Sequence, residues 1–228
     1  MPLKVELINH TPDPEHAIAA AARLCYAPVG ASDLLENMDE KAQKSVLRTI
    51  MNSGHLSALE HASFSFAVEG VSRALTHQLV RHRLASFNQQ SQRYVSYKDG
   101  IEKITPARIE ENEEALEIFN EALDRTDEAY KKLLELDIPA EDARYILPNA
   151  AETKIVITMN IRELLHFFRL RCCNRAQWEI RAMAHEMLKL CRPHAPYIFA
   201  CAGAPCVEGP CPEGKMTCGN PYPKAERD

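Results

Sequence analysis

A dense set of hydrogen-bond donors lies in the stretch LVRHRLASFNQQSQRY, residues 79–94. It contains no acidic residue and no lysine, and its basic side chains are Arg81, His82, Arg83 and Arg93. The guanidinium group of arginine is a planar fork that can donate to two oxygens of a phosphate at once, which lysine cannot copy. Two serines and an asparagine add neutral donors and acceptors. The stretch therefore suggests a site for a phosphate on a hydrogen-bonding ring, such as a nucleotide. The alternative is a solvated helix end.

A second basic set follows downstream and consists of Arg144, Arg162, Arg169, Arg171 and Arg175. Arg162, His166 and Arg169 are spaced i, i+4 and i+7, so they share one face of a helix. Phe167 and Phe168 lie beside them in the sequence, which indicates that not all of these arginines are solvent-exposed surface residues.

The common phosphate-binding signatures are missing. The sequence has neither the glycine pattern of a dinucleotide-binding fold nor a P-loop, so side-chain arginines and helix ends would have to hold any nucleotide. A nucleophile elbow is also missing. His185 and Glu186 begin a zinc-protease pattern, but Lys189 stands where the second histidine ligand belongs, so no metal site is predicted from them.

Charge is distributed unevenly over the 228 residues, whose formal net charge is −5. Residues 110–137 hold eleven acids and three bases, so the rest of the chain carries a charge of +3. This balance argues against a nucleic-acid partner and favours small anionic ligands. No apolar run is long enough to span a membrane, and the first residues do not resemble a signal peptide, so we expect a cytoplasmic protein without a membrane partner.

The elements expected to position these residues predict an α+β fold that is mostly helical, with a small antiparallel or mixed sheet. Alternating apolar residues predict strands at 4–10, 62–70 and 154–160, and apolar spacing predicts helices at 13–26, 39–54, 71–87, 109–136, 161–172 and 176–191. The long acidic helix would bury a stripe that runs from Ala115 and Ile118 through Tyr130 to Leu134. No linker divides the chain, so residues 1–228 are expected to form a single domain, with 193–228 as a Cys-, Pro- and Gly-rich tail packed on it.

Four of the eight cysteines lie in that tail, namely Cys201, Cys206, Cys211 and Cys218. They could bind structural zinc, form disulfides or remain reduced thiols. The short C-x2-C zinc spacing is absent, and the three alternatives stay open.

The stretch RHRLASFNQQSQRY resembles the signature of the flavin-dependent thymidylate synthases, R-H-R followed after seven residues by serine. Arg81, His82 and Arg83 with Ser91 match it, and the wider pattern also includes Ser86, Asn88, Arg93 and Tyr94. AARLCY, GHLSALEH, ARYILP, MNIRELLHFFRLR and AQWEIR resemble other segments of that family. The resemblance covers roughly residues 1–200 and leaves out the tail.

The resemblance implies reductive methylation of dUMP to dTMP, with carbon from methylenetetrahydrofolate and electrons from NADPH, both carried in turn by FAD. It implies no metal and no cysteine nucleophile. It also implies a homotetramer whose active sites combine residues from several subunits, so that distant arginines can serve one site.

Carried over by position, the family's dUMP contacts would be Gln78, Arg81, Gln89, Ser91, Arg93, Arg144 and Arg171. Arg171 would be catalytic, because a cation beside the uracil ring favours its N3-deprotonated form and so raises the electron density at C5.

The FAD contacts implied by the same resemblance are Ser57, Glu60, Arg81, His82, Arg83, Leu84, Asn88, Gln89, Asn160, Arg162 and His166. His55 and Tyr94 match positions on the flavin and folate face. Three residues depart from the family pattern. Gln89 stands where many members have Glu, His166 where Asn is common, and Cys25 where Ser is common.

Two other functions fit part of these observations. A nucleic-acid or nucleotide-binding regulator could use the arginines without chemistry, and a flavin-binding protein could have lost methylation activity. The acidic net charge opposes the first, and the intact set of Arg81, Ser91 and Arg171 opposes the second.

Overall fold

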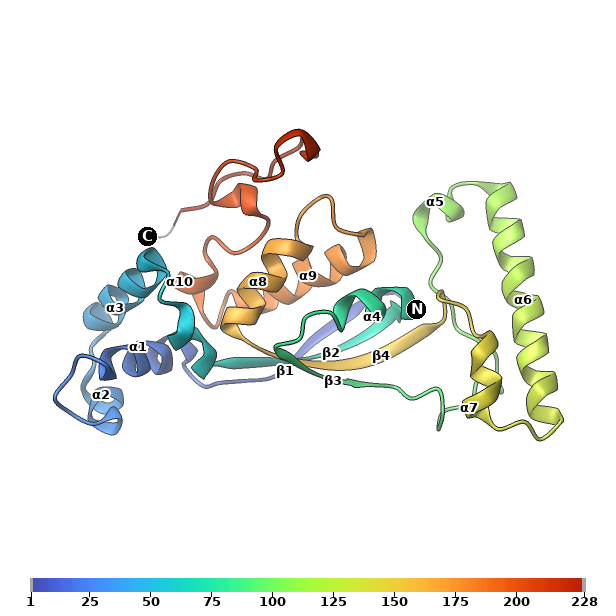
Figure 1. The fold of residues 1–228 in the computed structure, drawn as a ribbon, viewed down its shortest axis with the longest axis horizontal. Coiled ribbons are helices and arrows are strands. Elements are labelled where there is room, and N and C mark those ends of the chain that lie inside the picture. The colour runs from blue at the N-terminus through green and yellow to red at the C-terminus, as the bar shows by residue number, and fades with distance from the viewer. Residues whose placement is uncertain (1, 227–228) are drawn as a thin grey trace. The chain divides into compact units, whose positions relative to one another are not determined.

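Four strands form one sheet with the order β1-β2-β4-β3 (Figure 1). The strands are β1 (Lys4–His10), β2 (Ser63–Ser72), β3 (Ala85–Gln89) and β4 (Glu152–Asn160). Residues 63–69 of β2 alternate between half-buried and buried, as expected for a strand with one covered face. The computed structural model describes residues 2–226, and the α+β prediction is confirmed.

The chain divides into two compact units, which we describe separately. Unit 1 contains residues 2–4, 68–81 and 87–156. Its helices are α4 (Arg73–Leu79), α5 (Ala107–Glu110), α6 (Glu113–Glu135), α7 (Ala140–Ala143) and the 3-10 turn η2 (Arg144–Ile146). Helix α6 lies beside α5 and α7 (Figure 1). The prediction of a single domain stays a prediction.

Gly70 fixes the beginning of the chain in unit 1. Its φ of +68° lies in the left-handed region, and a Cβ there would lie 2.2 Å from the Pro2 carbonyl oxygen. The Gly70 amide also donates to the buried Glu152 carboxylate at 2.9 Å. Glycine is therefore required both by the backbone conformation and by the close approach of the Pro2 backbone.

Unit 2 contains residues 5–67, 82–86 and 157–226. Its helices are α1 (Pro14–Leu24), α2 (Ala31–Asn37), α3 (Glu40–Ser53), η1 (Leu56–His61), α8 (Ile161–Arg171), α9 (Trp178–Cys191), α10 (Pro196–Phe199), η3 (Pro205–Val207) and η4 (Gly214–Met216). Phe64, Phe168 and Phe199 are fully buried at its centre, and the ring of Phe199 lies 5.9 Å from each of the other two. Aromatic pairs at this spacing and tilt are favourable beyond the area that they bury.

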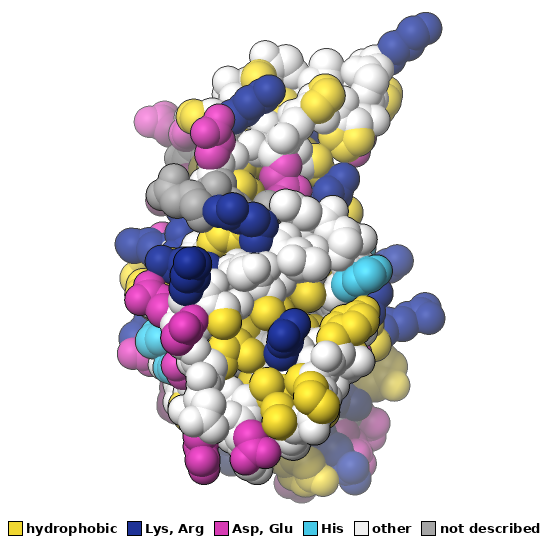
Figure 2. Space-filling model, turned by 90° about the vertical axis from the view of Figure 1, so that its left-hand side faces the viewer, with side chains coloured by type: hydrophobic (Ala, Val, Ile, Leu, Met, Phe, Trp, Pro, Cys, Tyr) yellow, Lys and Arg dark blue, Asp and Glu magenta, His cyan; other side chains and the backbone are white. Residues whose placement is uncertain are grey.

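Helices α1–α3 carry an exposed hydrophobic surface on unit 2. Figure 2 shows hydrophobic side chains gathered around a basic one on this side of the molecule. Large hydrophobic side chains exposed along α1, α2 and the segment between them are Leu24, Tyr26, Val29 and Leu35. Asp39 caps α3 by accepting from the Ala42 amide, and Gly54 ends it at φ +72°, so the predicted end of this helix is confirmed.

The prediction of a continuous helix over residues 71–87 is wrong. Helix α4 begins at its N-cap Ser72 and ends at Leu79, and residues 85–89 form β3 instead. The two-residue alternation in β3, with Ser86 and Asn88 exposed between half-buried neighbours, is the strand signal that the spacing of Leu75 and Leu79 obscured. Consequently, Gln78, Arg81 and His82 do not share a helical face.

The other predicted elements are present with shifted ends. Five short helices were not predicted, namely α2, η1, α10, η3 and η4. The predicted buried stripe of the long helix is only partly correct. Tyr130 is fully buried, but Ile118 is 64% exposed.

Candidate functional site

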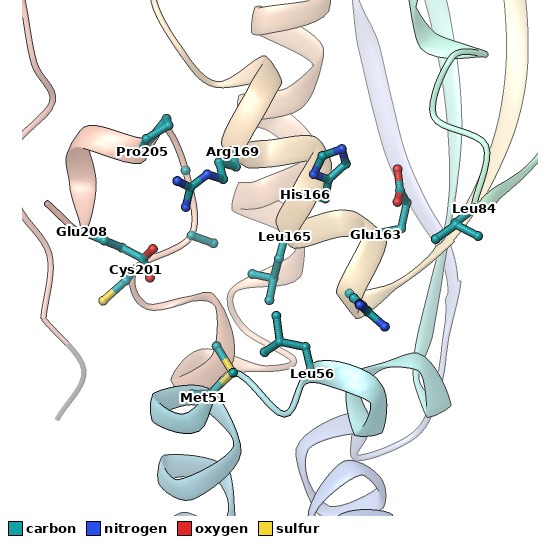
Figure 3. A pocket seen from close by; sticks show the side chains of 14 residues that line it. Met51, Leu56, Leu84, Glu163, Leu165, His166, Arg169, Cys201, Pro205 and Glu208 are labelled. Atoms are coloured by element: carbon teal, nitrogen blue, oxygen red, sulfur yellow. The ribbon is translucent and has the colours of Figure 1, made fainter. Parts of the chain in front are cut away.

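A cavity of about 610 Å³ in unit 2 brings together several of the residues expected to bind a flavin. Leu84, Arg162 and His166 line it, together with Arg169. In Figure 3, Glu163 and His166 project from α8 on the side of Leu84, whereas Arg169 and Glu208 lie at the opposite end.

Helix α8 positions the basic side chains of this cavity. Asn160 is its N-cap, and the Oδ1 atom of Asn160 accepts from the Glu163 amide at 2.9 Å. The prediction that Arg162, His166 and Arg169 share one face is confirmed, because all three line the cavity. Met51, Leu56, Leu165 and Pro205 are among the residues that give the cavity apolar surface.

Arg162, which lines the cavity, forms an ion pair with Glu60 from η1. Both side chains are about half-exposed, so water can reach the pair. His55 is the N-cap of η1, and Ser57 lies within it; both are exposed. The segment GHLSALEH, which resembles a segment of the family, thus supplies the Glu60 carboxylate to Arg162 of α8.

His82 connects the two ends of α8. Its Nδ1 atom lies 3.0 Å from Oε1 of Glu163, and the Nε atom of Arg171 donates to its Nε2 atom at 3.1 Å. The ring of His82 packs 5.0 Å from that of Phe167, and the residue is only 5% exposed. Both ring nitrogens of His82 are therefore engaged by protein groups.

The hydrogen-bond pattern determines the tautomer of His82. A guanidinium nitrogen can only donate, so the Nε2 atom of His82 must accept from Arg171 and carry no proton. The proton of a neutral ring is then on Nδ1, which donates to the carboxylate of Glu163. Burial lowers the pKa of His82, although its hydrogen bond to the Glu163 carboxylate raises it; the charges of Arg171 and His166 lower it further. His82 is thus neutral at neutral pH.

His82, Glu163 and His166 also place potential metal-ligand atoms within 4.8 Å of one another. The geometry does not favour a cation there. The Nε2 atom of His82 already accepts from the positively charged Arg171, whose charge would repel a metal ion. We therefore interpret this cluster as a hydrogen-bond network.

Arginines from two segments converge on Glu141 in unit 1. The Nε atom of Arg93 lies 2.5 Å from the Glu141 carboxylate, and the Nε atom of Arg144 donates to the Glu141 carbonyl at 3.0 Å. The guanidinium of Arg93 also lies 5.4 Å from the ring centre of Tyr94, which is 79% exposed. Arg93, at the end of the signature, and the half-buried Arg144 of η2 thus form one cation cluster around Glu141.

Ser91 and Gln89, which lie close to Arg93 in the sequence, form hydrogen bonds within the protein. The Ser91 hydroxyl accepts from the Arg93 amide at 3.1 Å, which forms a local turn. The Gln89 amide donates to the hydroxyls of Thr76 and Thr153 at 3.1 and 3.2 Å. Only an amide can donate to both hydroxyls, so glutamine suits this position, where many family members have Glu.

The remaining predicted residues lie at more open positions. Gln78 is half-buried in α4, and Arg81 is exposed just after that helix. Arg83 and Asn88 are also exposed. Arg81 and Asn88 belong to unit 1, whereas Arg83 belongs to unit 2. Their predicted ligand contacts stay predictions.

Sequence reasoning missed Arg73, Glu141 and Glu163 as parts of these clusters. Burial lowers the pKa of the half-buried Arg73, and the charge of Arg144 contributes to this decrease. Glu163 had a detectable signal, because Asn160 followed three residues later by Glu is a helix-capping pattern. Glu141 had none, because Arg93, with which its carboxylate pairs, lies far away in the sequence.

All eight cysteines are free thiols in the structure. The tail cysteines do not share one site as a set of four. Cys206, Cys211 and Cys218 line a cavity of about 20 Å³ together with Cys173, whereas Cys201 lines the large cavity. The choice between zinc and reduced thiols stays open.

Within the residues that the structure describes, no helix is both long and apolar enough to cross a membrane.

Comparisons with known proteins identify the family. Residues 6–197 match the family model described as thymidylate synthase complementing protein. The chain is 56% identical over 218 residues to a flavin-dependent thymidylate synthase of Geobacter sulfurreducens, covering 95% of this chain and 94% of that protein. It is 48% identical over 235 residues to one of Clostridium tetani, covering 96% and 94%.

Among solved structures, the fold is similar to that of a UMP/dUMP methylase, PolB of Streptomyces cacaoi, bound with 5-Br dUMP. The TM-score is 0.73 at 26% identity, and the match covers 87% of this chain and 93% of that one. The full donor signature at residues 81–94 is present, and the matches extend over most of the chain. The chain belongs to the flavin-dependent thymidylate synthase family.

Proposed function

We propose that the protein methylates dUMP reductively to dTMP, using methylenetetrahydrofolate as the carbon donor, NADPH as the reductant and FAD as the cofactor. The proposal rests on family membership and on the residues that the fold gathers. The observation that carries it is the α8 cavity, because residues expected at a flavin site from three parts of the sequence line its wall or pair with a lining residue.

The chemistry of this cavity fits a flavin nucleotide. Arg162 and Arg169 offer cationic donors for a pyrophosphate, and His166 adds a polar edge. Met51 and Leu56 offer apolar surface for an aromatic ring system. We propose that Asn160 and Glu60 support the bound cofactor from the two sides of Arg162. When bound, FAD would supply the electron transfer and carry the one-carbon group.

The cation cluster of unit 1 suits the phosphate of dUMP. Arg93 and Arg144 are both held near Glu141, and the Arg93–Glu141 pair is about half-exposed. An exposed ion pair is worth only about 0–1 kcal/mol, so a phosphate dianion can replace the carboxylate at little cost. Ser91, Gln78, Arg81 and Gln89 would complete the recognition of the nucleotide.

Arg171 would act on the uracil ring. Its charge would favour loss of the N3 proton and would raise the electron density at C5, where the new carbon is added. Preorganised charges of this kind contribute strongly to catalysis because they need no rearrangement during the reaction. His55 and Tyr94 would lie at the flavin and folate face.

We further propose a homotetramer in the cytoplasm whose active sites combine residues of several subunits. The exposed Ile118 on the amphipathic helix α6 supports an association surface, because soluble helices normally bury such a stripe. The free thiols support a reducing compartment.

A visible absorbance spectrum of the purified, untagged protein, recorded before and after addition of FAD, tests the cofactor assignment. We expect a flavin spectrum that bleaches with NADPH. A colourless protein that does not take up FAD would remove the central inference. Steep salt dependence of DNA or RNA binding in that colourless protein would favour the regulatory alternative.

A further inference from the structure

We propose that Glu163 and His82 are positioning residues that orient Arg171 through one buried hydrogen-bond chain. This inference deepens the proposed function and rests on it, because Arg171 has its assigned role only in that reaction. Neither comparison nor motif identifies a role for Glu163, and the resemblance assigned His82 to the flavin.

The hydrogen-bond chain from Arg171 through His82 to Glu163 has a defined direction. Glu163 accepts from Nδ1 of His82 at 3.0 Å, and Nε2 of His82 accepts from Nε of Arg171 at 3.1 Å. Reversing either bond is impossible for an ionised carboxylate and a guanidinium, since the first only accepts and the second only donates. The carboxylate therefore selects the one neutral tautomer of His82 that can hold Arg171.

The surroundings hold this chain in place. Glu163 and His82 are 5% exposed each, and the ring of Phe167 packs against the imidazole. Glu163 lies in the first turn of α8, where the helix dipole favours a negative charge, and its amide is capped by Asn160. A buried polar group is costly when it loses its partner, so each member stabilises the arrangement of the next.

Both nitrogens of His82 are committed within the chain, which leaves the ring without a nitrogen for the flavin. Its remaining contact surface is its carbon edge and the side toward His166, whose ring centre lies 5.8 Å away. The arrangement resembles the general pattern in which a carboxylate fixes the tautomer and orientation of a histidine.

The same hydrogen-bond chain predicts that turnover depends on pH. The ionisable groups that face His82 are Glu163, His166 and Arg171, all from α8. Protonation of His82 would place a proton on Nε2, which could then no longer accept from Arg171. Turnover should therefore fall at acidic pH as His82 gains its proton, at a pH below the ordinary histidine value of 6.5, because burial lowers its pKa.

The direct test is ¹⁵N NMR of the protein labelled at its nine histidines, with the His82 signal identified by its absence in His82→Gln. We expect the Nδ1–H tautomer of His82 at pH 7.5 in the wild type. A wild-type spectrum in which no histidine has this tautomer would overturn the proposal without any variant. This readout needs neither flavin nor activity, so it is independent of whether the proposed function fails.

Kinetics of Glu163→Gln test the consequence. Removing a group that orients a functional histidine costs about 10- to 100-fold at metal sites, and we expect a decrease of that size in kcat with the KM for dUMP nearly unchanged. The acidic limb of the pH profile should move to lower pH, because the charge that raises the pKa of His82 is gone. A purely structural role would not move this limb.

Glu15→Gln is the matched control. Glu15 is also a buried carboxylate in the first turn of a helix of unit 2, and it accepts from the Ile198 amide at 2.9 Å. We expect it to affect thermal stability without changing the His82 tautomer or the pH limb. Wild-type kcat together with an acidic limb that does not move in Glu163→Gln would contradict the proposal.

Discussion

Two arginines of the proposed site are held in opposite ways. Arg93 of unit 1 is about half-exposed and pairs directly with the half-exposed carboxylate of Glu141. Arg171 of unit 2 donates its Nε–H to His82, a buried and neutral ring, and the carboxylate of Glu163 lies one imidazole further away. An exposed ion pair can exchange its acid for a phosphate, whereas a buried chain fixes direction. The first arrangement suits binding, and the second suits orientation.

The largest expected effect is that of Arg171→Ala. We expect this variant to keep its flavin spectrum and to lose at least about 100-fold in dTMP formation, the loss typical for one preorganised electrostatic group. Arg175→Ala is the control, because Arg175 lies just beyond α8 and pairs with Glu213 outside the cavity. Unchanged turnover in Arg171→Ala would remove Arg171 from the mechanism.

Substitutions at the two ends of the unit 1 pair should act in opposite directions. Arg93→Ala loses a charge-assisted bond to phosphate, so we expect the KM for dUMP to rise about 10- to 100-fold. Glu141→Gln removes the competing carboxylate and keeps the carbonyl that accepts from Arg144, so the KM should fall by up to about fivefold. Steady-state kinetics at two ionic strengths measure both effects. An increase in the KM of Glu141→Gln would mean that Glu141 orients Arg93 and does not compete for it.

Ser91→Ala should have a smaller effect on the same step. Its hydroxyl accepts from the Arg93 amide, and loss of one neutral hydrogen bond corresponds to about a 3- to 10-fold weaker dUMP-dependent step. Equilibrium binding of dUMP and turnover should be measured together. If both are intact, the assignment of Ser91 fails.

The smallest expected effect is a difference in reactivity between exposed and buried thiols. Burial raises the pKa of Cys172 to about 12 and raises that of Cys191 as well, so neither forms the reactive thiolate at pH 8. Cys25 and Cys218 are exposed. In a timed reaction with a thiol reagent, followed by peptide mass mapping, we expect Cys25 and Cys218 to be modified before Cys172. Early modification of Cys172 would show that its environment opens readily.

The sequence predicted local features better than distant ones. The shared face of Arg162, His166 and Arg169 follows from helical spacing, and the structure confirms it. The helix over 71–87 was wrong because an apolar repeat in α4 was extended into a strand whose alternation is short. Pairing with another strand decides such cases, and a local pattern does not contain that information.

Roles that depend on contacts between distant residues were not predictable. Glu163 and His82 are 81 residues apart, and neither the capping pattern nor the family signature indicates that they meet. The motif residue Gln89 likewise uses its amide on two threonine hydroxyls. Spacing identifies which side chains can donate, but the fold determines what they donate to.

The most direct test of the central claim is an assay of dTMP formation by the purified full-length protein with dUMP, methylenetetrahydrofolate, NADPH and FAD, each omitted in turn from protein freed of its cofactor. From the proposed function we expect dTMP only in the complete mixture. We also expect that FAD restores the activity of the depleted protein, as this function requires. Formation of dTMP at the same rate without any flavin, or no dTMP from a protein that binds FAD and dUMP, would contradict it.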